Sequence, residues 1–326
     1  MKKILFVILT LLIILGLSFG IYSYYIVNKI NTVEFTDNNE ELGIKENIKN
    51  NQQEKVKEEI TNIAIFGIDS RSTKDQGRSD SIMILTIDTK HNKVKLTSLM
   101  RDSYVNIDPY GYDKLNHAYA YGGPLLAVKT INQNFNTDIK EYITVNFESV
   151  IDIINYFGGV NIYISQEEME LINKYQYEAE MITGKPTDIL GEYGNVTLSG
   201  MQALSYSRIR DLGNGDFDRT ERQRTVLNAL MKKAKTLDIT NIPGIISSVA
   251  PMITTSLTKG EMISLASNTL KNISDFEQQR FPLDGYCENL IIDDIWYLKF
   301  DEKATAEQIY NYLFLDIKPV NKDPLF

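Results

Sequence analysis

The sequence predicts a three-layer α/β/α domain with a central mixed sheet, preceded by one N-terminal transmembrane helix. Three observations support this fold class. Short, nearly continuous apolar runs recur between residues 62 and 164, as expected for strands buried on both faces. Helix-like stretches separate these runs, and alternating strands and helices form a sheet covered by helices on both sides. One long uncharged run precedes the pattern at the N-terminus.

The uncharged run covers residues 4–27 and follows Lys2 and Lys3. As a helix, its 24 residues would extend roughly 36 Å, enough to cross a hydrocarbon core of about 30 Å. A cleaved signal peptide fits less well, because the run is long and no small-x-small site closes it. Since the lysines precede the run, we expect residues 1–3 in the cytoplasm, a signal anchor at 4–27 and the rest of the chain outside the cell.

Two regions follow the expected anchor. Residues 28–60 are rich in Asn, Glu, Lys and Gln, which indicates a polar stalk, and residues 61–326 are long enough to bury a core of their own.

Cys287 is the one cysteine, so an intrachain disulfide is excluded and a buried thiol without an assigned role is expected. The net charge of −9 excludes a generally basic surface for nucleic acid.

Apolar runs and helix-like stretches alternate along the expected domain. The runs that predict strands are residues 62–69, 81–88, 93–99, 142–147 and 160–164. The stretches that predict helices are residues 122–135, 147–156, 199–206 and 219–235. Pro124 fits the first turn of its helix, where its missing N–H would have no partner. Gly158 and Gly159 fit the end of a helix before the last strand.

Arginine is concentrated in three short segments. The chain has 25 lysines and nine arginines, and eight of the arginines lie in residues 70–80, 100–102 and 207–224. A guanidinium fork binds carboxylate or phosphate through two hydrogen bonds, whereas an ammonium group acts as a point charge. Aspartates are interleaved with these arginines, which favours an anion site with a divalent metal over a set of surface salt bridges.

The predicted strand ends place part of these segments together. Asp69 ends the first strand, Arg78 and Asp80 precede the second, and Arg101 follows the third. If the second strand runs antiparallel to both neighbours, all four residues lie at one edge of the sheet. Ligands of α/β folds bind where loops leave the strand ends. We therefore expect the site at this edge.

The third arginine segment continues into a predicted helix. Asp218, with an acidic residue three positions on, is expected to be its N-cap. Arg219 and Gln223 share a stripe with the apolar residues of this helix, so both should face inward at its entrance. A helix N-terminus offers free N–H groups and a partial positive charge to an anion. Arg224 points away from the stripe and Arg222 lies at its border, and we expect both in solvent or in salt bridges.

Seven short segments carry a family resemblance. They are residues 62–71 (NIAIFGIDSR), 77–80 (GRSD), 98–102 (SLMRD), 116–123 (NHAYAYGG), 158–160 (GGV), 200–210 (GMQALSYSRIR) and 215–224 (GDFDRTERQR). In this order they resemble the LytR-CpsA-Psr family, membrane-anchored extracytoplasmic enzymes of Gram-positive cell walls. Met100 stands where the family usually has a proline, which alters the turn but leaves Arg101 and Asp102 in place.

The resemblance implies a reaction. Such enzymes transfer a phospho-glycan (teichoic acid, capsular polysaccharide or another wall polymer) from an undecaprenyl-pyrophosphate carrier to a peptidoglycan hydroxyl, forming a phosphodiester with Mg²⁺ present. Phosphoryl transfer requires positioning and charge stabilisation more than a covalent nucleophile, which suits an arginine cluster. A polyprenyl-pyrophosphate hydrolase and a non-catalytic wall regulator or scaffold remain alternatives. The implied location is the cell membrane of a Gram-positive-type envelope.

The resemblance also assigns site residues. It implies that Asp69 and Asp80 hold Mg²⁺, which prefers a few carboxylates with waters and phosphate oxygens. Arg101, Asp102 and Asp216 are the catalytic candidates, and which aspartate takes the hydroxyl proton stays open. An apolar tunnel between sheet and helices would hold the lipid tail, although the same residues also suit an ordinary core. The side chains expected to bind the pyrophosphate are Arg78, Arg101, Arg208, Arg210, Arg219 and Gln223.

Overall fold

A computed structural model describes residues 30–45, 59–69, 77–235, 248, 250–262, 264–265 and 275–322. The anchor expected at residues 4–27 lies outside these ranges. Within them, no helix combines the length and the apolar character that a membrane span requires.

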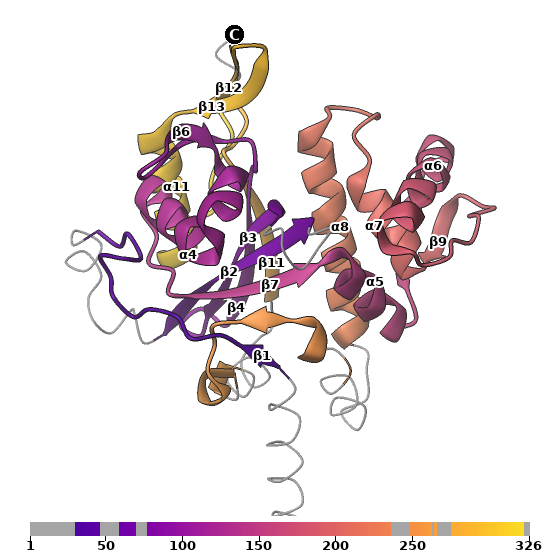
Figure 1. The fold of residues 1–326 in the computed structure, drawn as a ribbon, viewed down its shortest axis with the longest axis horizontal. Coiled ribbons are helices and arrows are strands. Elements are labelled where there is room, and N and C mark those ends of the chain that lie inside the picture. Colours follow the sequence, from indigo (N-terminus) through magenta and orange to yellow (C-terminus); the bar gives the residue numbers. More distant parts are fainter. Residues whose placement is uncertain are drawn as a thin grey trace, which may run out of the picture.

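A mixed sheet of seven strands runs through the centre of the molecule (Figure 1). Strand β3 pairs antiparallel with both β2 and β4, whereas β7 is parallel to β2 and β11 is parallel to β4. This confirms the predicted mixed sheet and the expected reversal of the second strand. The strands, in spatial order, are β1 (Asn31–Thr32), β10 (Thr254–Thr255), β7 (Glu141–Asn146), β2 (Ile60–Asp69), β3 (Arg78–Asp88), β4 (Lys93–Leu99) and β11 (Asp275–Phe281).

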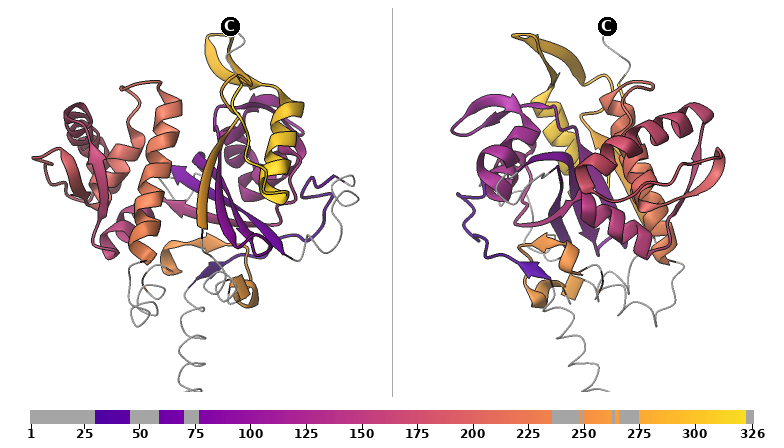
Figure 2. Two further views of the ribbon diagram at one scale, coloured as in Figure 1. Left: turned by 180° about the vertical axis from the view of Figure 1, so that it is seen from behind. Right: turned by 45° about the vertical axis from the view of Figure 1, so that its right-hand side comes forward.

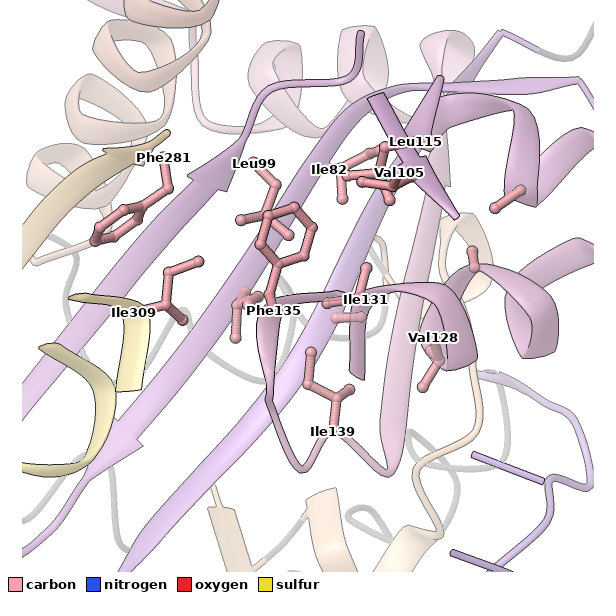
Figure 3. Packing of buried hydrophobic residues seen from close by; sticks show 14 of the residues in the cluster. Ile82, Leu99, Val105, Leu115, Val128, Ile131, Phe135, Ile139, Phe281 and Ile309 are labelled. Atoms are coloured by element: carbon pink, nitrogen blue, oxygen red, sulfur yellow. The ribbon is translucent and has the colours of Figure 1, made fainter. Parts of the chain in front are cut away.

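Helices cover both faces of this sheet (Figure 2). The face under α4 and α11 holds the main hydrophobic core, in which Ile131 and Phe135 of α4 pack with Ile82 and Leu99 of the sheet (Figure 3). Helices α5, α7 and α8 lie on the other face. The bounds are α4 (Leu115–Phe135), α11 (Glu302–Phe314), α5 (Phe147–Tyr156), α7 (Gly200–Arg208) and α8 (Asp216–Lys235), and a 3₁₀ turn, η2 (Ala250–Met252), precedes β10.

A second, smaller core lies beside α7 and α8. There a two-stranded sheet of β8 (Val160–Ile164) and β9 (Gly194–Leu198) packs with α6 (Gln166–Thr183) and both helices. The strand predicted at 160–164 is present, but it pairs outside the central sheet. Its burial alternates, with Tyr163 exposed, as is typical of a strand covered on one face.

Two helices begin earlier than predicted. α4 starts at Leu115 and is kinked where Gly122 and Gly123 leave helical geometry, so the glycines interrupt the helix instead of opening it. α8 starts at Asp216, and the interpretation of Asp218 as its N-cap was wrong. The Asp218 carboxylate instead accepts the N–H of residue 214 at 2.8 Å and closes the preceding turn.

Residues 30–45 pack on the domain although their composition indicated a stalk. Leu42 is fully buried in the main core, and its carbonyl accepts a hydrogen bond from the Asn132 amide at 2.8 Å. Phe35 packs edge-on against Tyr142, with ring centres 5.0 Å apart. The globular part of the chain therefore begins before residue 61, because a few apolar side chains in this polar stretch enter the core.

Two hairpins that the sequence did not predict lie together at the end of the molecule away from β1 (Figures 1 and 2). They are β5 (Tyr104–Ile107) with β6 (Gly111–Lys114), and β12 (Cys287–Ile292) with β13 (Ile295–Phe300). A parallel bridge joins Ser103 to Leu298, and the Leu298 N–H donates to the Asp102 carbonyl at 2.9 Å. The second hairpin is therefore attached to the segment that carries Arg101.

Candidate active site

A β-bulge directs a second carboxylate toward the face of the sheet under α8. Side chains alternate along β2, and Gly67 and Asp69 lie on this face. Strand β3 follows the same alternation as far as Ser81, where the register with β2 shifts by one residue. Asp80 is the extra residue of this bulge, so it lies on the same face as Ser81 instead of the opposite one. Bulges often re-aim a side chain beside a functional site.

A cavity of about 450 Å³ lies between this face and α5, α7 and α8. Its charged and polar residues come from the end of β2, the start of β3, the end of α7 and the first turns of α8, with Tyr175 and Glu178 from α6. A volume of this size is typical of small-molecule sites. The apolar part is formed by Ile65, Met83, Val145, Phe147, Val150, Leu204, Val226 and Leu227, and the polar part includes Asp69, Asp80, Ser207, Arg208, Arg210, Arg219 and Gln223.

A cleft of about 630 Å³ adjoins the cavity at Arg210, which lines both. The cleft lies between the α7–α8 turn and the β12–β13 hairpin. In contrast to the cavity, it is lined mainly by polar and charged side chains. They include Arg101, Asp102, Lys114, Asn214, Asp216, Glu288, Asn289 and Trp296.

A cluster of ion pairs connects the cavity and the cleft. Arg101 pairs with Asp80, its Nε lies 3.1 Å from Asp102 Oδ2, and its Nη2 lies 3.3 Å from Asp216 Oδ1. Asp216 also accepts a hydrogen bond from Arg219 Nη2 at 3.0 Å. Asp80 and Arg219 line the cavity, whereas Arg101 and Asp216 line the cleft. The predicted gathering of Asp80 and Arg101 at one sheet edge is therefore confirmed.

The two aspartates beside Arg101 have pKa values shifted in opposite directions. Burial raises the pKa of Asp216, and the neighbouring arginines offset only part of that effect. Burial acts in the same direction on Asp102, but Arg101 and Lys114, whose Nζ lies 2.7 Å away, lower its pKa. When the pKa values of two neighbouring carboxyl groups are shifted apart, one group commonly acts as acid or base and the other orients a neighbouring residue. Asp216 is the better suited of the two to take up a proton.

Two arginine nitrogens in the cavity wall are buried without a hydrogen-bond partner among the described residues. They are Nη1 of Arg208 and Nε of Arg219. The Arg208 guanidinium lies over the ring of Phe147, 5.3 Å from its centre, and burial lowers the pKa of Arg219 to about 10. A buried donor without a partner costs about 1–3 kcal/mol, and more when it is charged. Both groups are therefore suited to bind the oxygen atoms of an anion.

The remaining expected phosphate ligands have different positions. Gln223 lines the cavity one turn after Arg219, as its place on the helical stripe requires. Arg210 is exposed, with its Nε 3.7 Å from Asp216. Arg78 is also exposed, and its backbone lies opposite Asp69 where β3 pairs with β2. Arg78 lines neither the cavity nor the cleft as the structure describes them. Its position therefore does not support the expectation that it binds the pyrophosphate.

Two other arginines of α8 form salt bridges, as predicted. Arg222 is buried, and its Nε lies 3.0 Å from Glu168 of α6. Arg224 pairs with Glu221 one turn away. Neither lines the cavity or the cleft as the structure describes them. The Arg222 pair therefore joins α8 to α6, whereas the Arg224 pair lies within α8.

Asp69 and Asp80 fit a magnesium ion by the number and type of their oxygen atoms. Both carboxylates line the cavity, as Arg208 and Arg219 do. In the described parts of the chain, no group of three or more Asp, Glu, His or Cys side chains could hold a metal ion alone. Mg²⁺ usually takes one or two protein carboxylates and completes its shell with waters and phosphate oxygens. Two carboxylates beside an anion site therefore match this preference.

Sequence reasoning missed three side chains of the site. Lys114 holds Asp102, Phe147 supports Arg208, and Trp296 lines the cleft. Phe147 had a weak local signal, since it stands at the first turn of a helix, whereas Lys114, the last residue of β6, and Trp296 had none. Cys287 also lines the cleft, half-buried, and burial raises the pKa of its thiol, which favours the protonated form.

Known proteins are similar to this chain over most of its length. The LytR_cpsA_psr family matches residues 23–312. The chain belongs to this family. Among curated relatives, a polyisoprenyl-teichoic acid–peptidoglycan teichoic acid transferase TagU of Bacillus anthracis is 33% identical over 310 residues, covering 94% of this chain and 95% of the relative. The TagU of Bacillus licheniformis is 30% identical over 314 residues, covering 94% of each chain.

Solved structures of LytR_cpsA_psr proteins have the same fold. YwtF (TagT) with bound octaprenyl pyrophosphate lipid superimposes with a TM-score of 0.60 at 27% identity, over 81% of this chain and 94% of that one. The protein gbs0355 of Streptococcus agalactiae superimposes with a TM-score of 0.66 at 25% identity, over 84% and 94% of the two chains. The mixed α/β fold of this chain is therefore that of its family.

Proposed function

We propose that the chain transfers a phospho-glycan from a polyprenyl-pyrophosphate carrier, undecaprenyl in the family, to a peptidoglycan hydroxyl and forms a phosphodiester. The position of the arginine cluster carries this proposal, because the cluster lies between an apolar cavity and a polar cleft. A lipid-linked pyrophosphate needs an apolar site next to an anion site, and its acceptor needs separate access. The names of the TagU relatives and the lipid bound by TagT support the same substrates. The glycan is a teichoic acid, a capsular polysaccharide or another secondary wall polymer.

Donor binding uses both parts of the cavity. The prenyl groups nearest the pyrophosphate occupy the part lined by Met83 and Val226, where each buried CH₂ contributes about 0.8 kcal/mol. The pyrophosphate oxygens accept hydrogen bonds from the free donors of Arg208 and Arg219. Guanidinium groups suit this role because they bind phosphate through two parallel hydrogen bonds. Arg101, Arg210 and Gln223 complete the set.

The reaction is an in-line displacement at the phosphorus atom that carries the glycan. The acceptor hydroxyl oxygen forms a new bond to this phosphorus while the bond to the bridging oxygen breaks, so polyprenyl monophosphate leaves. The hydroxyl proton moves to Asp216, whose pKa burial raises and which lines the cleft. Asp102 orients Arg101, which stabilises charge on the transferred phosphate. Phosphoryl transfer depends mainly on such positioning and electrostatic stabilisation.

Asp69 and Asp80 are the residues that would hold Mg²⁺. Bound there, the ion would neutralise charge on the phosphate oxygens. The Asp80 carboxylate also pairs with Arg101, so it positions the arginine at the reacting phosphate.

The proposed location follows from the two substrates. A polyprenyl-linked donor lies in a membrane, and peptidoglycan lies outside it. We therefore keep residues 4–27 as a signal anchor, with residues 1–3 in the cytoplasm and the domain outside the cell membrane of a Gram-positive-type envelope. Lys2 and Lys3 before the uncharged run support this orientation.

The test is a transfer assay with the full-length chain, a polyprenyl-pyrophosphate glycan, Mg²⁺ and peptidoglycan fragments. We expect one polyprenyl phosphate for each glycan linked, a loss of about 10²–10³-fold in Arg101→Ala, and less transfer after EDTA treatment. Arg224→Ala, which changes an arginine outside both the cavity and the cleft, is the control and should keep its activity. Polyprenyl phosphate without linked glycan would favour the hydrolase, and lipid binding without either product would favour the scaffold.

A further inference from the structure

Aromatic side chains gather where the two hairpins meet. We call six of them the aromatic strip: Tyr104, Tyr110, Tyr112, Tyr121, Trp296 and Tyr297. Ring centres lie 5.1 Å apart in the Tyr104–Tyr112 pair, 5.0 Å apart in Tyr104–Tyr297 and 4.7 Å apart in the stacked Tyr110–Tyr121 pair. Single exposed aromatic residues are common on protein surfaces. Here Tyr110 is 57% exposed, Tyr112 52% and Tyr121 41%, although each of them packs on another ring of the strip.

The aromatic strip leads to the charged residues of the site. Lys114 Nζ lies 5.7 Å from the ring centre of Trp296 and 5.5 Å from that of Tyr297. The same Nζ lies 2.7 Å from Asp102, the neighbour of Arg101. The backbone bridge between residues 103 and 298 holds the two hairpins together. The strip is thus placed on regular backbone that is continuous with the catalytic segment.

The cleft beside Trp296 has the chemistry of a sugar site. Glu288, Asn289 and Asp284 supply carboxylate and amide groups that can bond hydroxyls. Trp296 donates its Nε1–H to Asn289 Oδ1 at 3.0 Å, which fixes the orientation of the indole. A pyranose ring has an apolar C–H face that packs on an aromatic ring and hydroxyl edges that bond to polar groups. Rigid aromatic rings with a few placed polar groups are typical of such sites.

We propose that the cleft and the aromatic strip bind the acceptor as an extended glycan chain, with the sugar that carries the attacking hydroxyl at Trp296. This inference rests on the proposed function. In an in-line displacement the attacking oxygen enters opposite the leaving group. The leaving polyprenyl phosphate points into the cavity, so the acceptor enters from the cleft. Further sugars then lie on Tyr297, Tyr104 and Tyr112, and the most distant ones on Tyr110 and Tyr121.

The donor also carries sugars, so the experiment must separate the two sources. It uses the full-length chain, one lipid-linked glycan donor, and peptidoglycan glycan chains of one and of several disaccharides as acceptors. In Trp296→Ala we expect the acceptor KM to rise about tenfold for both acceptor lengths. In Tyr110→Ala we expect it to rise only for the long acceptor. The donor KM should stay unchanged in both variants.

Tyr163→Ala is the matched control, because Tyr163 is an exposed tyrosine on β8, in the two-stranded sheet outside the site. It should leave every constant unchanged, and thermal unfolding verifies that all three variants fold. An unchanged acceptor KM in Trp296→Ala would overturn the proposal, and so would a rise in the donor KM alone.

If the wild type transfers nothing, the proposed function fails. Calorimetric titration with the long glycan chain then decides separately: binding lost in Trp296→Ala supports the strip, and binding that is absent or unaffected overturns it.

Discussion

The two faces of the central sheet come from neighbouring residues of the same strands, yet one is packed and the other is hollow. Ala64 and Phe66 of β2 are fully buried in the main core under α4. Ile65 of the same strand and Met83 of β3 line the cavity under α8. The residue types hardly differ, so apolar character along a strand does not reveal whether a face is packed or holds a ligand. The difference lies in the opposing helix, since α8 presents Arg219 to the sheet.

The largest effect is expected from replacing that arginine. Arg219→Met should lower the rate of transfer by about 10²–10³-fold, because it removes donors for the pyrophosphate. Burial of a charge is unfavourable, and Asp216 keeps Arg101 as a partner, so we expect an unchanged or higher Tm. Transfer assays and thermal unfolding measure the two effects. A Tm lower by more than about 5 °C would show that the hollow face depends on Arg219 for its stability.

At the sheet edge where the two faces meet, we expect ion pairs to contribute more to the unfolding free energy than apolar packing does. The pKa of Asp102 is lower in the folded chain than its ordinary value of 3.8, so its stabilising contribution is present above that value and is lost as the pH falls through the folded pKa. Asp102→Asn should lower the unfolding free energy by on the order of 3 kcal/mol at pH 7. The deficit should shrink as the pH falls below 3.8 and through the folded pKa of Asp102.

Urea denaturation at pH 7 and at a pH below 3.8 measures how the loss of unfolding free energy in Asp102→Asn depends on pH. Asp211→Asn is the control, because Asp211 forms an exposed pair with Lys174 and should contribute little at either pH. A deficit of Asp102→Asn that is equal at both pH values would mean that hydrogen-bond geometry, and not ionisation, is the source of its contribution.

The smallest effects are expected from two matched substitutions that replace a valine by phenylalanine. Val128→Phe, in the main core under α4, should lower the unfolding free energy by about 1–3 kcal/mol, because a packed core has no room for the ring. Val145→Phe, in the cavity wall, should change it by less than about 1 kcal/mol and should weaken binding of polyprenyl pyrophosphate. Chemical denaturation and lipid titration compare them. Equal losses of stability in both variants would contradict the contrast between the two faces.

Much of the candidate site could be predicted because local periodicity positions it. The period of a strand places Asp69 on the face of the cavity, and the stripe of a helix places Arg219 and Gln223 there. The bulge at Asp80 could not be predicted, since it depends on the pairing of two strands. Trp296 reaches the cleft through a backbone bridge between residues 103 and 298, and no local pattern records such a distant contact.

By itself, the sequence determined the four strands β2, β3, β4 and β7 of the central sheet, most of helices α4, α5, α7 and α8, the arginine and aspartate motifs and the family. These features depend on local propensity, periodicity and short motifs. Only the tertiary structure decided which face of the sheet is hollow, which aspartate has the raised pKa and which aromatic side chains border the cleft. Those properties depend on burial and on contacts between distant segments. A pattern along one segment cannot specify them, because the same apolar or charged residue behaves differently according to what packs against it.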